Sequence, residues 1–322
     1  MKFLSIPNEG SSWRGRLCYS FAIDGDEAQN ILVEILNSRT NELLGKVRLF
    51  GVTGGEVDIA PYIRPYVSLK PAETLRQVEL LFSPSAIGVV VRVNGTTSAV
   101  RHFFRSKVDS SAVGVLSSVS RSQEIAAGDT IRLTIYAATT IETSVVYKGR
   151  KVSTVKCDGR TDGMPMEFVV GTQGIEGLEM VSISVRCDGK GLLNYDFVVR
   201  SDRGSAQRLV WYNAQGGIEG YLFDHAICLG YGVTRTPRRA YGDGVMSTVG
   251  RVKYRLCSGY GLQAEMERVA QLLLSPVVYR EAEGVCRAVE VDSRDIAFDR
   301  RGLLHSITLD VSEEWRGGDS LW

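Results

Sequence analysis

The sequence predicts a mainly β protein, built from two immunoglobulin-like β-sandwich domains and a small C-terminal α+β domain. Three observations support this fold class. Apolar and polar residues alternate over many short runs, Gly, Asn and Asp separate those runs, and one amphipathic helix stands near the C-terminus. The predicted domains are residues 1–105, 112–205 and 206–322. A chain of 322 residues has the length of two or three ordinary domains.

The first block contains the clearest strand and turn signals. Residues 31–36 and 45–50 alternate and predict a strand with its return strand, joined by the turn-like residues 37–41. Residues 89–100 predict a hairpin, because Asn94-Gly95 supplies the two positive φ angles that a type I′ turn requires. Residues 57–66 hold two prolines, so they predict a strand end followed by a short helical turn.

The second block follows a serine-rich stretch, residues 106–122, which is typical of a linker or an edge. Residues 130–136, 181–185 and 195–199 predict strands, and residues 143–147 and 151–155 predict a hairpin. Cys157 and Cys187 end two similar runs, each followed by Asp-Gly, so adjacent strands would bring their sulfurs close. The six cysteines lack a CxxC pair and zinc-site spacing, which favours free thiols over disulfides.

The last block differs because it contains one convincing helix, over residues 262–274. Its apolar residues recur at helical spacing on one face, and Pro276 ends the helix. The predicted apolar face consists of Leu262, Met266, Val269, Ala270, Leu273 and Leu274. Alternating residues 250–256, 289–291 and 306–311 predict strands on either side, which gives the α+β character.

Composition excludes several classes of function. The 38 Lys and Arg nearly cancel the 37 Asp and Glu, for a net charge of +1, so no nucleic-acid partner is expected. No stretch reaches the roughly 20 apolar residues of a membrane span. Residues 1–9 lack the long apolar segment of a secretory signal. These features predict a protein that works inside the producing cell or within an assembled particle.

The sequence offers no motif for catalysis or for a cofactor. It has three histidines, His102, His225 and His305, and no nucleophile motif accompanies them. Asp224-His225 resembles an oriented general base, but neighbours on a strand point to opposite faces. No calcium loop, phosphate loop or dinucleotide pattern is present, so we predict no catalytic residue, no metal and no small-molecule substrate.

Two groups of residues are candidates for contacts with other proteins. Arg235, Arg238 and Arg239 form a basic loop, which either binds an acidic partner or is a solvated loop. Trp315 and Trp322 lie in a polar C-terminal tail, where an exposed tryptophan indicates docking onto another subunit. The alternative is that the tail packs on its own domain.

A third candidate is a turn framed by large apolar groups. Gly216 and Gly217 permit positive φ, and the Asn213 side chain can bond to the turn backbone. Trp211, Tyr221 and Phe223 surround this turn. The turn is either a hairpin that joins two blocks through a packed aromatic pair, or a contact between subunits.

Two short motifs carry a resemblance to a known family. Residues 211–223 resemble the Trp-x-Asn-x-x-Gly-Gly-x-x-x-Tyr-x-Phe signature of an uncharacterised family found in phage and prophage structural-gene clusters of Bacteroidetes. Residues 272–279 are similar to the Leu-Leu-x-Ser-Pro-x-Val-Tyr element of the same proteins, and residues 57–64 fit their layout. Together these motifs span most of the chain.

The resemblance implies a tail- or baseplate-type structural protein. Such a protein would form homo-oligomers, contact neighbouring tail proteins and reside in a virion or phage-like particle assembled in the bacterial cytoplasm. An adhesin-like β-sandwich that binds carbohydrate or a surface is the alternative function. A hydrolase whose site is assembled through the fold is a third hypothesis, which would need two carboxylates about 5–10 Å apart.

Overall fold

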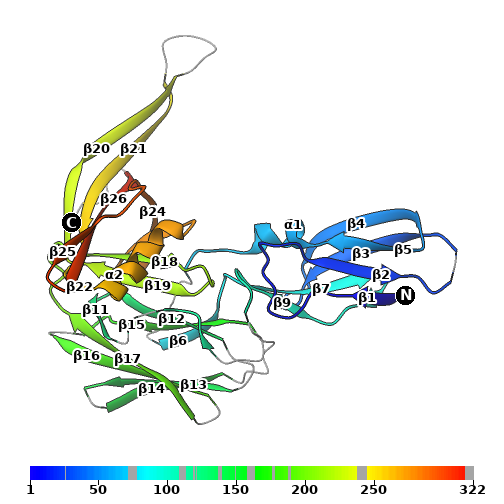
Figure 1. Ribbon diagram of the computed structural model, residues 1–322, viewed down its shortest axis with the longest axis horizontal. Coiled ribbons are helices and arrows are strands. Elements are labelled where there is room, and N and C mark those ends of the chain that lie inside the picture. The colour runs from blue at the N-terminus through cyan, green and yellow to red at the C-terminus, as the bar shows by residue number, and fades with distance from the viewer. Residues whose placement is uncertain are drawn as a thin grey trace.

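The computed structural model describes residues 1–25, 27–71, 78–108, 114–118, 120, 122–136, 140–148, 150–157, 164–175, 178–187, 190–237 and 245–315. The protein is mainly β, as the sequence predicts, with 60% of the described residues in strands and 7% in helices. The strands form several sheets, which group into an N-terminal, a middle and a C-terminal body (Figure 1). Each body contains its own large cluster of buried apolar side chains.

The N-terminal body places its core between two antiparallel sheets. One sheet has the order β1 (Lys2–Ser5), β2 (Cys18–Ala22), β5 (Gly54–Asp58). The other has the order β4 (Leu43–Val52), β3 (Gln29–Asn37), β7 (Ile87–Val93), β8 (Thr96–Thr97), and β9 (Arg101–Phe103) also pairs with β7. The predicted hairpin is confirmed, because Asn94 and Gly95 join β7 to β8 with φ angles of 43° and 87°. The predicted helical turn is α1 (Ala60–Ile63), followed by the 3₁₀ turn η1 (Arg64–Tyr66).

The middle body also contains two sheets around one core. A four-stranded sheet has the order β10 (Gly114–Val115), β12 (Thr130–Tyr136), β15 (Met166–Gly171), β6 (Val78–Phe82). A five-stranded sheet has the order β11 (Ser122–Ala126), β17 (Lys190–Arg200), β16 (Glu179–Cys187), β13 (Ile141–Tyr147), β14 (Arg150–Cys157). The hairpin predicted within residues 143–155 is confirmed as β13 and β14.

One strand crosses the predicted boundary between the first two blocks. β6 lies within residues 1–105, but it pairs with β15 of the middle body, from Val78 opposite Val170 to Phe82 opposite Met166. Leu80 of β6 packs against the core of the middle body, which explains why β6 joins a sheet of that body. β6 therefore belongs to a sheet of the middle body.

The two cysteine positions with similar surroundings do not lie on adjacent strands. Cys157 and Cys187 both stand opposite Ile141, one on each side of β13. Strands lie about 4.8 Å apart, so the two backbones are separated by about twice that distance. The side chains of both cysteines lie outside the described part of the structure.

The C-terminal body is a nine-stranded sheet covered by a helix. Its strand order is β19 (Ile218–Phe223), β18 (Gln207–Tyr212), β23 (Val278–Ala282), β24 (Val285–Val291), β26 (Leu304–Trp315), β21 (Val245–Cys257), β20 (His225–Pro237), and β22 (Gly261–Leu262) and β25 (Phe298–Arg301) also pair with β26. The helix α2 (Gln263–Ala270) continues into the 3₁₀ turn η2 (Gln271–Leu274).

The helical face differs from the prediction after Ala270. Met266 and Val269 are fully buried as predicted, but Leu272 is buried in place of Leu274, which is 76% exposed. The cause is the change to a 3₁₀ turn, which has about 3.0 residues per turn and therefore rotates the following side chains. Leu262 precedes the helix as its N-cap and is exposed.

Buried charges join the middle and C-terminal bodies. Glu281 of β23 is fully buried, and its carboxylate lies 3.0 Å from Nε of Arg208 on β18. It also lies 3.6 Å from Nη2 of Arg132, which belongs to β12 of the middle body. Asp129, also buried, pairs with Arg203 beside this group. Because each buried charge needs a partner, these ion pairs hold the two bodies in one arrangement.

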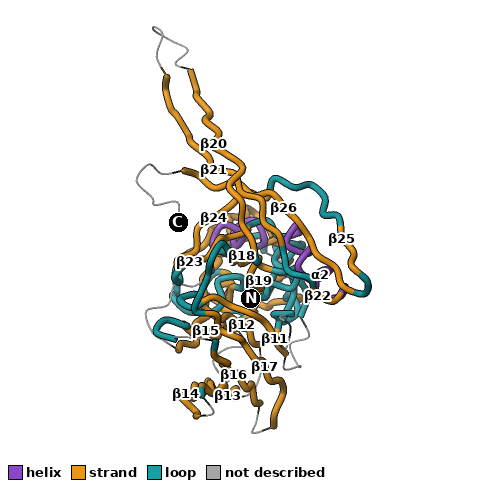
Figure 2. Tube along the Cα trace, turned by 90° about the vertical axis from the view of Figure 1, so that its left-hand side faces the viewer, coloured by secondary structure: helices purple, strands orange, loops and turns teal. Residues whose placement is uncertain are grey.

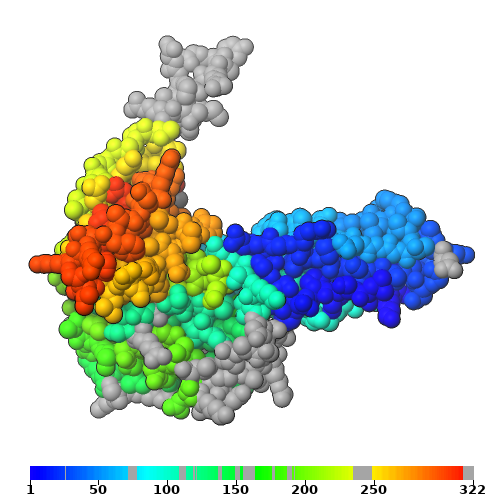
Figure 3. Space-filling model, viewed as in Figure 1, coloured from blue at the N-terminus to red at the C-terminus, as the bar shows by residue number. Residues whose placement is uncertain are grey.

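The molecule is elongated, and two parts extend from its main mass. The N-terminal body projects to one side as a separate lobe, as the space-filling view shows (Figure 3). The hairpin of β20 and β21 rises from the C-terminal body in another direction (Figure 1). Among the described residues, no helix has the length and apolar character needed to cross a membrane.

Candidate functional site

A long hairpin, here called the arm, consists of β20 and β21 and extends beyond the sheet that supports it (Figure 2). Its two strands have thirteen residues each, paired from His225 opposite Cys257 to Pro237 opposite Val245. The pairing of β21 with β26 ends at Gly250, so the described residues beyond it pair across the arm alone. At about 3.3 Å per residue, each strand of the arm spans about 40 Å.

The strand β20 forms an edge of the nine-stranded sheet, and four of its large side chains are apolar and exposed. Ile227, Leu229, Tyr231 and Val233 are each about half exposed, at 46–54%. Edge strands in soluble proteins are usually protected by lysines, prolines or short length. β20 carries no lysine, and its proline stands at its last position. β20 contains a β-bulge, which is another feature that protects edges, but its length and its exposed apolar side chains favour pairing with another chain.

A β-bulge in β20 distributes these apolar side chains over both faces of the arm. The register shifts between Cys228 and Gly230, where Gly230 has a φ of 145°. Before the bulge, Ile227 lies opposite the exposed Arg255; after it, Tyr231 lies opposite the buried Val252. Directly opposed residues share a face of a sheet, so Tyr231 extends the core face outward while Ile227 faces the other side.

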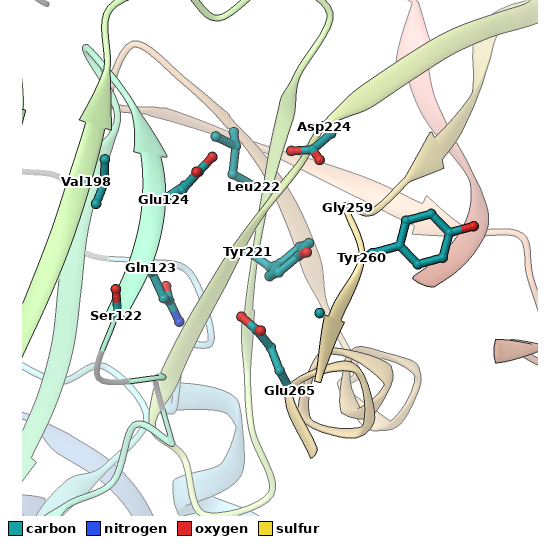
Figure 4. A pocket seen from close by; sticks show the side chains of 11 residues that line it. Ser122, Gln123, Glu124, Val198, Tyr221, Leu222, Asp224, Gly259, Tyr260 and Glu265 are labelled. Carbon is teal, nitrogen blue, oxygen red and sulfur yellow. The ribbon is translucent and has the colours of Figure 1, made fainter. Parts of the chain in front are cut away.

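A polar cleft of about 340 Å³ lies at the base of the arm, between the middle and C-terminal bodies (Figure 4). Strands β11, β17 and β19, the segment before β20, the loop before β22 and helix α2 contribute to it. Its lining residues are Ser122, Gln123, Glu124, Val198, Tyr221, Leu222, Asp224, Gly259, Tyr260, Gly261 and Glu265. This volume falls within the roughly 300–1,000 Å³ of ordinary binding pockets.

Three carboxylates give the cleft its charge, and no lysine or arginine is among its lining residues. Nη1 of Arg200, outside the lining, holds two of them in place, at 2.9 Å from Glu124 and 3.7 Å from Asp224. Glu265 is 3.9 Å from Arg268. Burial raises the pKa of Tyr221, and Glu265 and Asp224 raise it further, which places both carboxylates near this phenol.

Two glycines allow the carboxylates to approach the loop that precedes β22. A Cβ atom at Gly259 would lie 2.5 Å from Oδ2 of Asp224, and one at Gly261 would lie 2.8 Å from Oε2 of Glu265. The loop between them presents Tyr260, which is 45% exposed. Each of the three carboxylates therefore has an arginine within 4 Å, and Figure 4 shows Asp224 and Glu265 on either side of Tyr221.

The turn that the sequence singles out lies inside the chain. Trp211, Phe223 and Asn213 are buried, as are Gly216 and Gly217. The rings of Tyr221 and Phe223 pack edge to face with centroids 5.1 Å apart. In this arrangement these residues contact their own chain, as the hairpin alternative predicts, while a contact between subunits through the exposed Ala214 and Gln215 stays a prediction.

Hydrogen bonds show how this turn joins two bodies. Asn213 Oδ1 accepts from the backbone N–H groups of Gln215 at 3.0 Å and Gly217 at 2.9 Å. Its Nδ2 donates to the carbonyl oxygen of Leu116, at 2.7 Å. A Cβ atom at Gly217 would lie 2.3 Å from the backbone of Leu116, so a glycine is required there. The turn therefore fastens the C-terminal body to the segment before β11.

The other predicted contact residues lie at or beyond the limits of the described structure. Arg235 belongs to the outer part of β20, and Trp315 is the last residue of β26, where its backbone pairs with Gly250. Arg238, Arg239 and Trp322 lie outside the described residues.

No protein-family model matches the chain, and a search of curated proteins found no match.

The three histidines do not line the cleft. His102 Nδ1 contacts Glu9 at 2.6 Å in the N-terminal body, and His225 Nδ1 contacts Ser205 at 3.3 Å. The ring of His305 packs edge to face against Phe298. Among the described residues, no group of three or more His, Cys, Asp or Glu side chains is arranged to hold a metal ion.

Sequence reasoning missed the edge of the arm and the cleft. The arm had a readable signal, because apolar Ile227, Leu229, Tyr231 and Val233 alternate with small or polar neighbours. The cleft had no such signal, because its carboxylates come from three separate segments of the chain.

Proposed function

We propose that this chain is a structural protein of a phage tail, baseplate or similar particle, and that it acts by self-assembly and contacts with neighbouring tail proteins. The observation that carries the proposal is the arm, whose edge strand β20 is thirteen residues long and exposes four large apolar side chains. A strand edge with uncovered backbone groups can accept a strand of another subunit.

The energetics favour an occupied edge. Burying a large apolar side chain completely stabilises by about 1.5–3 kcal/mol, so complete burial of half-exposed Ile227, Leu229, Tyr231 and Val233, which lie on both faces of the arm, would contribute at most about 3–6 kcal/mol. Backbone hydrogen bonds to a partner strand would contribute more. This gain is large enough to offset much of the entropy lost on association.

The proposal extends to the architecture and location of the protein. Each of the first two bodies packs two sheets around one apolar cluster, which supports immunoglobulin-like sandwiches. The helix on the C-terminal sheet supports an α+β domain. The resemblance of residues 211–223 to phage structural proteins supports a virion or phage-like particle assembled in the bacterial cytoplasm.

The test is the mass of the full chain in solution by light scattering over a range of concentrations. We expect the wild type to form oligomers, and a variant with Ile227→Ser and Val233→Ser to dissociate to the 35.4 kDa monomer. Leu178→Ser is the matched control, because Leu178 is 75% exposed but lies in the middle body. A wild type that stays monomeric at high concentration and binds no neighbouring tail protein would refute the proposal.

A further inference from the structure

The uncharged part of β20 distinguishes this strand from the other edges of the described sheets. Residues 226–234 include no Lys, Arg, His, Asp or Glu. Every other described strand at the edge of a sheet either contains a charged residue or is two residues long. Charged side chains and short length both oppose pairing at an edge. An uncharged, apolar strand therefore fits β20, and within the described part of the chain only β20 itself has this character.

Beyond the β-bulge, the outer half of β20 has two different faces. Gly230 and Gly232 lie on one face, opposite exposed basic residues of β21. A Cβ atom at either glycine would meet nothing within 4 Å, so another backbone can approach closely there. Tyr231 and Val233 lie on the other face, and each is 53% exposed. This half of the strand therefore offers an open edge with two large apolar side chains on a single face.

Pairing with the same half of a second copy matches these apolar side chains. Identical strands that pair antiparallel are related by a two-fold axis, and directly opposed residues share a face of the sheet. With the axis at Gly232, Tyr231 of each copy lies opposite Val233 of the other, which gives two pairs of an aromatic with a β-branched residue. An axis at Tyr231 would give one pair of tyrosines and would place Val233 opposite the bulge residue Leu229. The axis at Gly232 therefore gives the better match.

The outer part of the arm also lacks a third strand among the described residues. β21 pairs with β26 only as far as Gly250, which lies opposite Val233 of β20. The described residues beyond this point form a two-stranded ribbon, and such ribbons are marginally stable in water. Pairing of two β20 strands would place four strands side by side, in the order β21, β20, β20, β21. A second copy would therefore stabilise the arm as well as cover its edge.

We propose that two copies of the chain pair antiparallel through the outer halves of their β20 strands, about a two-fold axis at Gly232. This inference rests on the proposed self-assembly and specifies its partner, its symmetry and its register. The interface is isologous, because each copy contributes the same surface, and it closes at two copies. Contacts with neighbouring proteins would then use other surfaces of the dimer.

Cysteine cross-linking of the full chain tests the symmetry and the register. Gly232→Cys should form a disulfide with its own copy under an added oxidant, because directly opposed Cα atoms lie about 4.5–5.5 Å apart and a disulfide needs them within about 7 Å. The variant should fold, since a Cβ atom at Gly232 would meet nothing within 4 Å. The product is a covalent dimer of twice the 35.4 kDa chain mass in denaturing electrophoresis without reductant.

Ile227→Cys is the matched control, because Ile227 lies on the same strand and is 54% exposed. It lies five residues from the axis in each copy, so the two introduced thiols would be about 33 Å apart at about 3.3 Å per residue and should not link. The wild type is the second control. Its free Cys228 lies four residues from the axis in each copy, which separates it from its counterpart by about 26 Å.

A second variant tests the contribution of the apolar pairs. Tyr231→Ser with Val233→Ser should associate at least about tenfold more weakly than the wild type in light scattering, because both cross-strand pairs are lost. Leu178→Ser, in the middle body, should keep the wild-type mass. Circular dichroism confirms that each variant folds. Unchanged association of the double variant would contradict the proposed contact.

The results separate this inference from the proposed self-assembly. Cross-linking of Gly232→Cys without cross-linking of Ile227→Cys supports the two-fold pairing. If both variants cross-link, the strands pair parallel and in register; if neither does, another surface covers β20. Either result overturns the inference, while oligomers in light scattering leave self-assembly standing. A monomeric wild type also overturns the inference, and its binding to neighbouring tail proteins then decides the proposed function.

Discussion

Replacing Glu281 tests whether buried ion pairs hold the middle and C-terminal bodies together. Its fully buried carboxylate lies 3.0 Å from Arg208 and 3.6 Å from Arg132, and these arginines are themselves buried. Glu281→Ala would remove the carboxylate that pairs with the buried Arg208 and that also lies near Arg132. Removing one partner of a buried pair costs about 3–5 kcal/mol, so we expect the free energy of unfolding to fall by that amount.

The assay is thermal unfolding by calorimetry, together with urea titration. A loss of about 3–5 kcal/mol lowers Tm by roughly 6–20 °C in domains of 150–250 residues. The control is Glu290→Ala, which breaks the exposed pair between Glu290 and Arg251 and should cost less than about 1 kcal/mol. If Glu281→Ala costs no more than this control, the arginines are solvated without Glu281, and the proposed role of the cluster is wrong.

Three further predictions concern single buried groups. Gly217→Ala should destabilise the protein by about 1–3 kcal/mol through overpacking. Gly232→Ala is the control, because a Cβ atom there would meet nothing within 4 Å. Equal Tm values for the two variants would contradict this prediction. Burial raises the pKa of Asp129 to about 6, so the folded state binds a proton at this carboxyl more tightly than the unfolded state does. The contribution of Asp129 to the free energy of unfolding therefore falls as the pH rises from about 4 through 6. Asp129→Asn should flatten that fall in urea titrations at several pH values, and an unchanged slope would refute the assignment. Burial raises the pKa of the Cys286 thiol to about 12, so mass spectrometry at pH 8 should find it alkylated more slowly than Cys257, and equal rates would show that it is accessible as thiolate.

The sequence predicted those parts of the fold that depend on local patterns. The turn at Asn94-Gly95 and the hairpin of β13 and β14 follow from residues close together in the chain, so their signals are complete within a short window. Pairing between distant strands leaves no such signal. β6 is a short, mostly apolar strand, and nothing in residues 78–82 shows that its partner is β15 rather than a neighbour in the first block.

The candidate site also has one part that a local pattern predicts and another part that depends on distant segments of the chain. Ile227 and Val233 of the arm could have been recognised from alternation in β20, although the bulge at Gly230 changes which face each residue occupies. Trp211 was a weaker guide, because a large apolar ring is as well suited to a core as to an interface, and here it is fully buried. The cleft depended on bringing Glu124 and Glu265 together from the middle and C-terminal bodies, which requires the whole fold.

The buried polar contacts between the middle and C-terminal bodies also bear on the proposed assembly. In a closed assembly of identical copies, any error in the angle between two bodies of one copy is repeated in every copy, so closure needs a fixed angle. The arm belongs to the C-terminal body, and the middle body lies against the same sheet. The ion pairs of Glu281 and the hydrogen bonds of Asn213 connect these two bodies. Loosening this joint should therefore broaden the distribution of assembly sizes in light scattering even when the arm is intact.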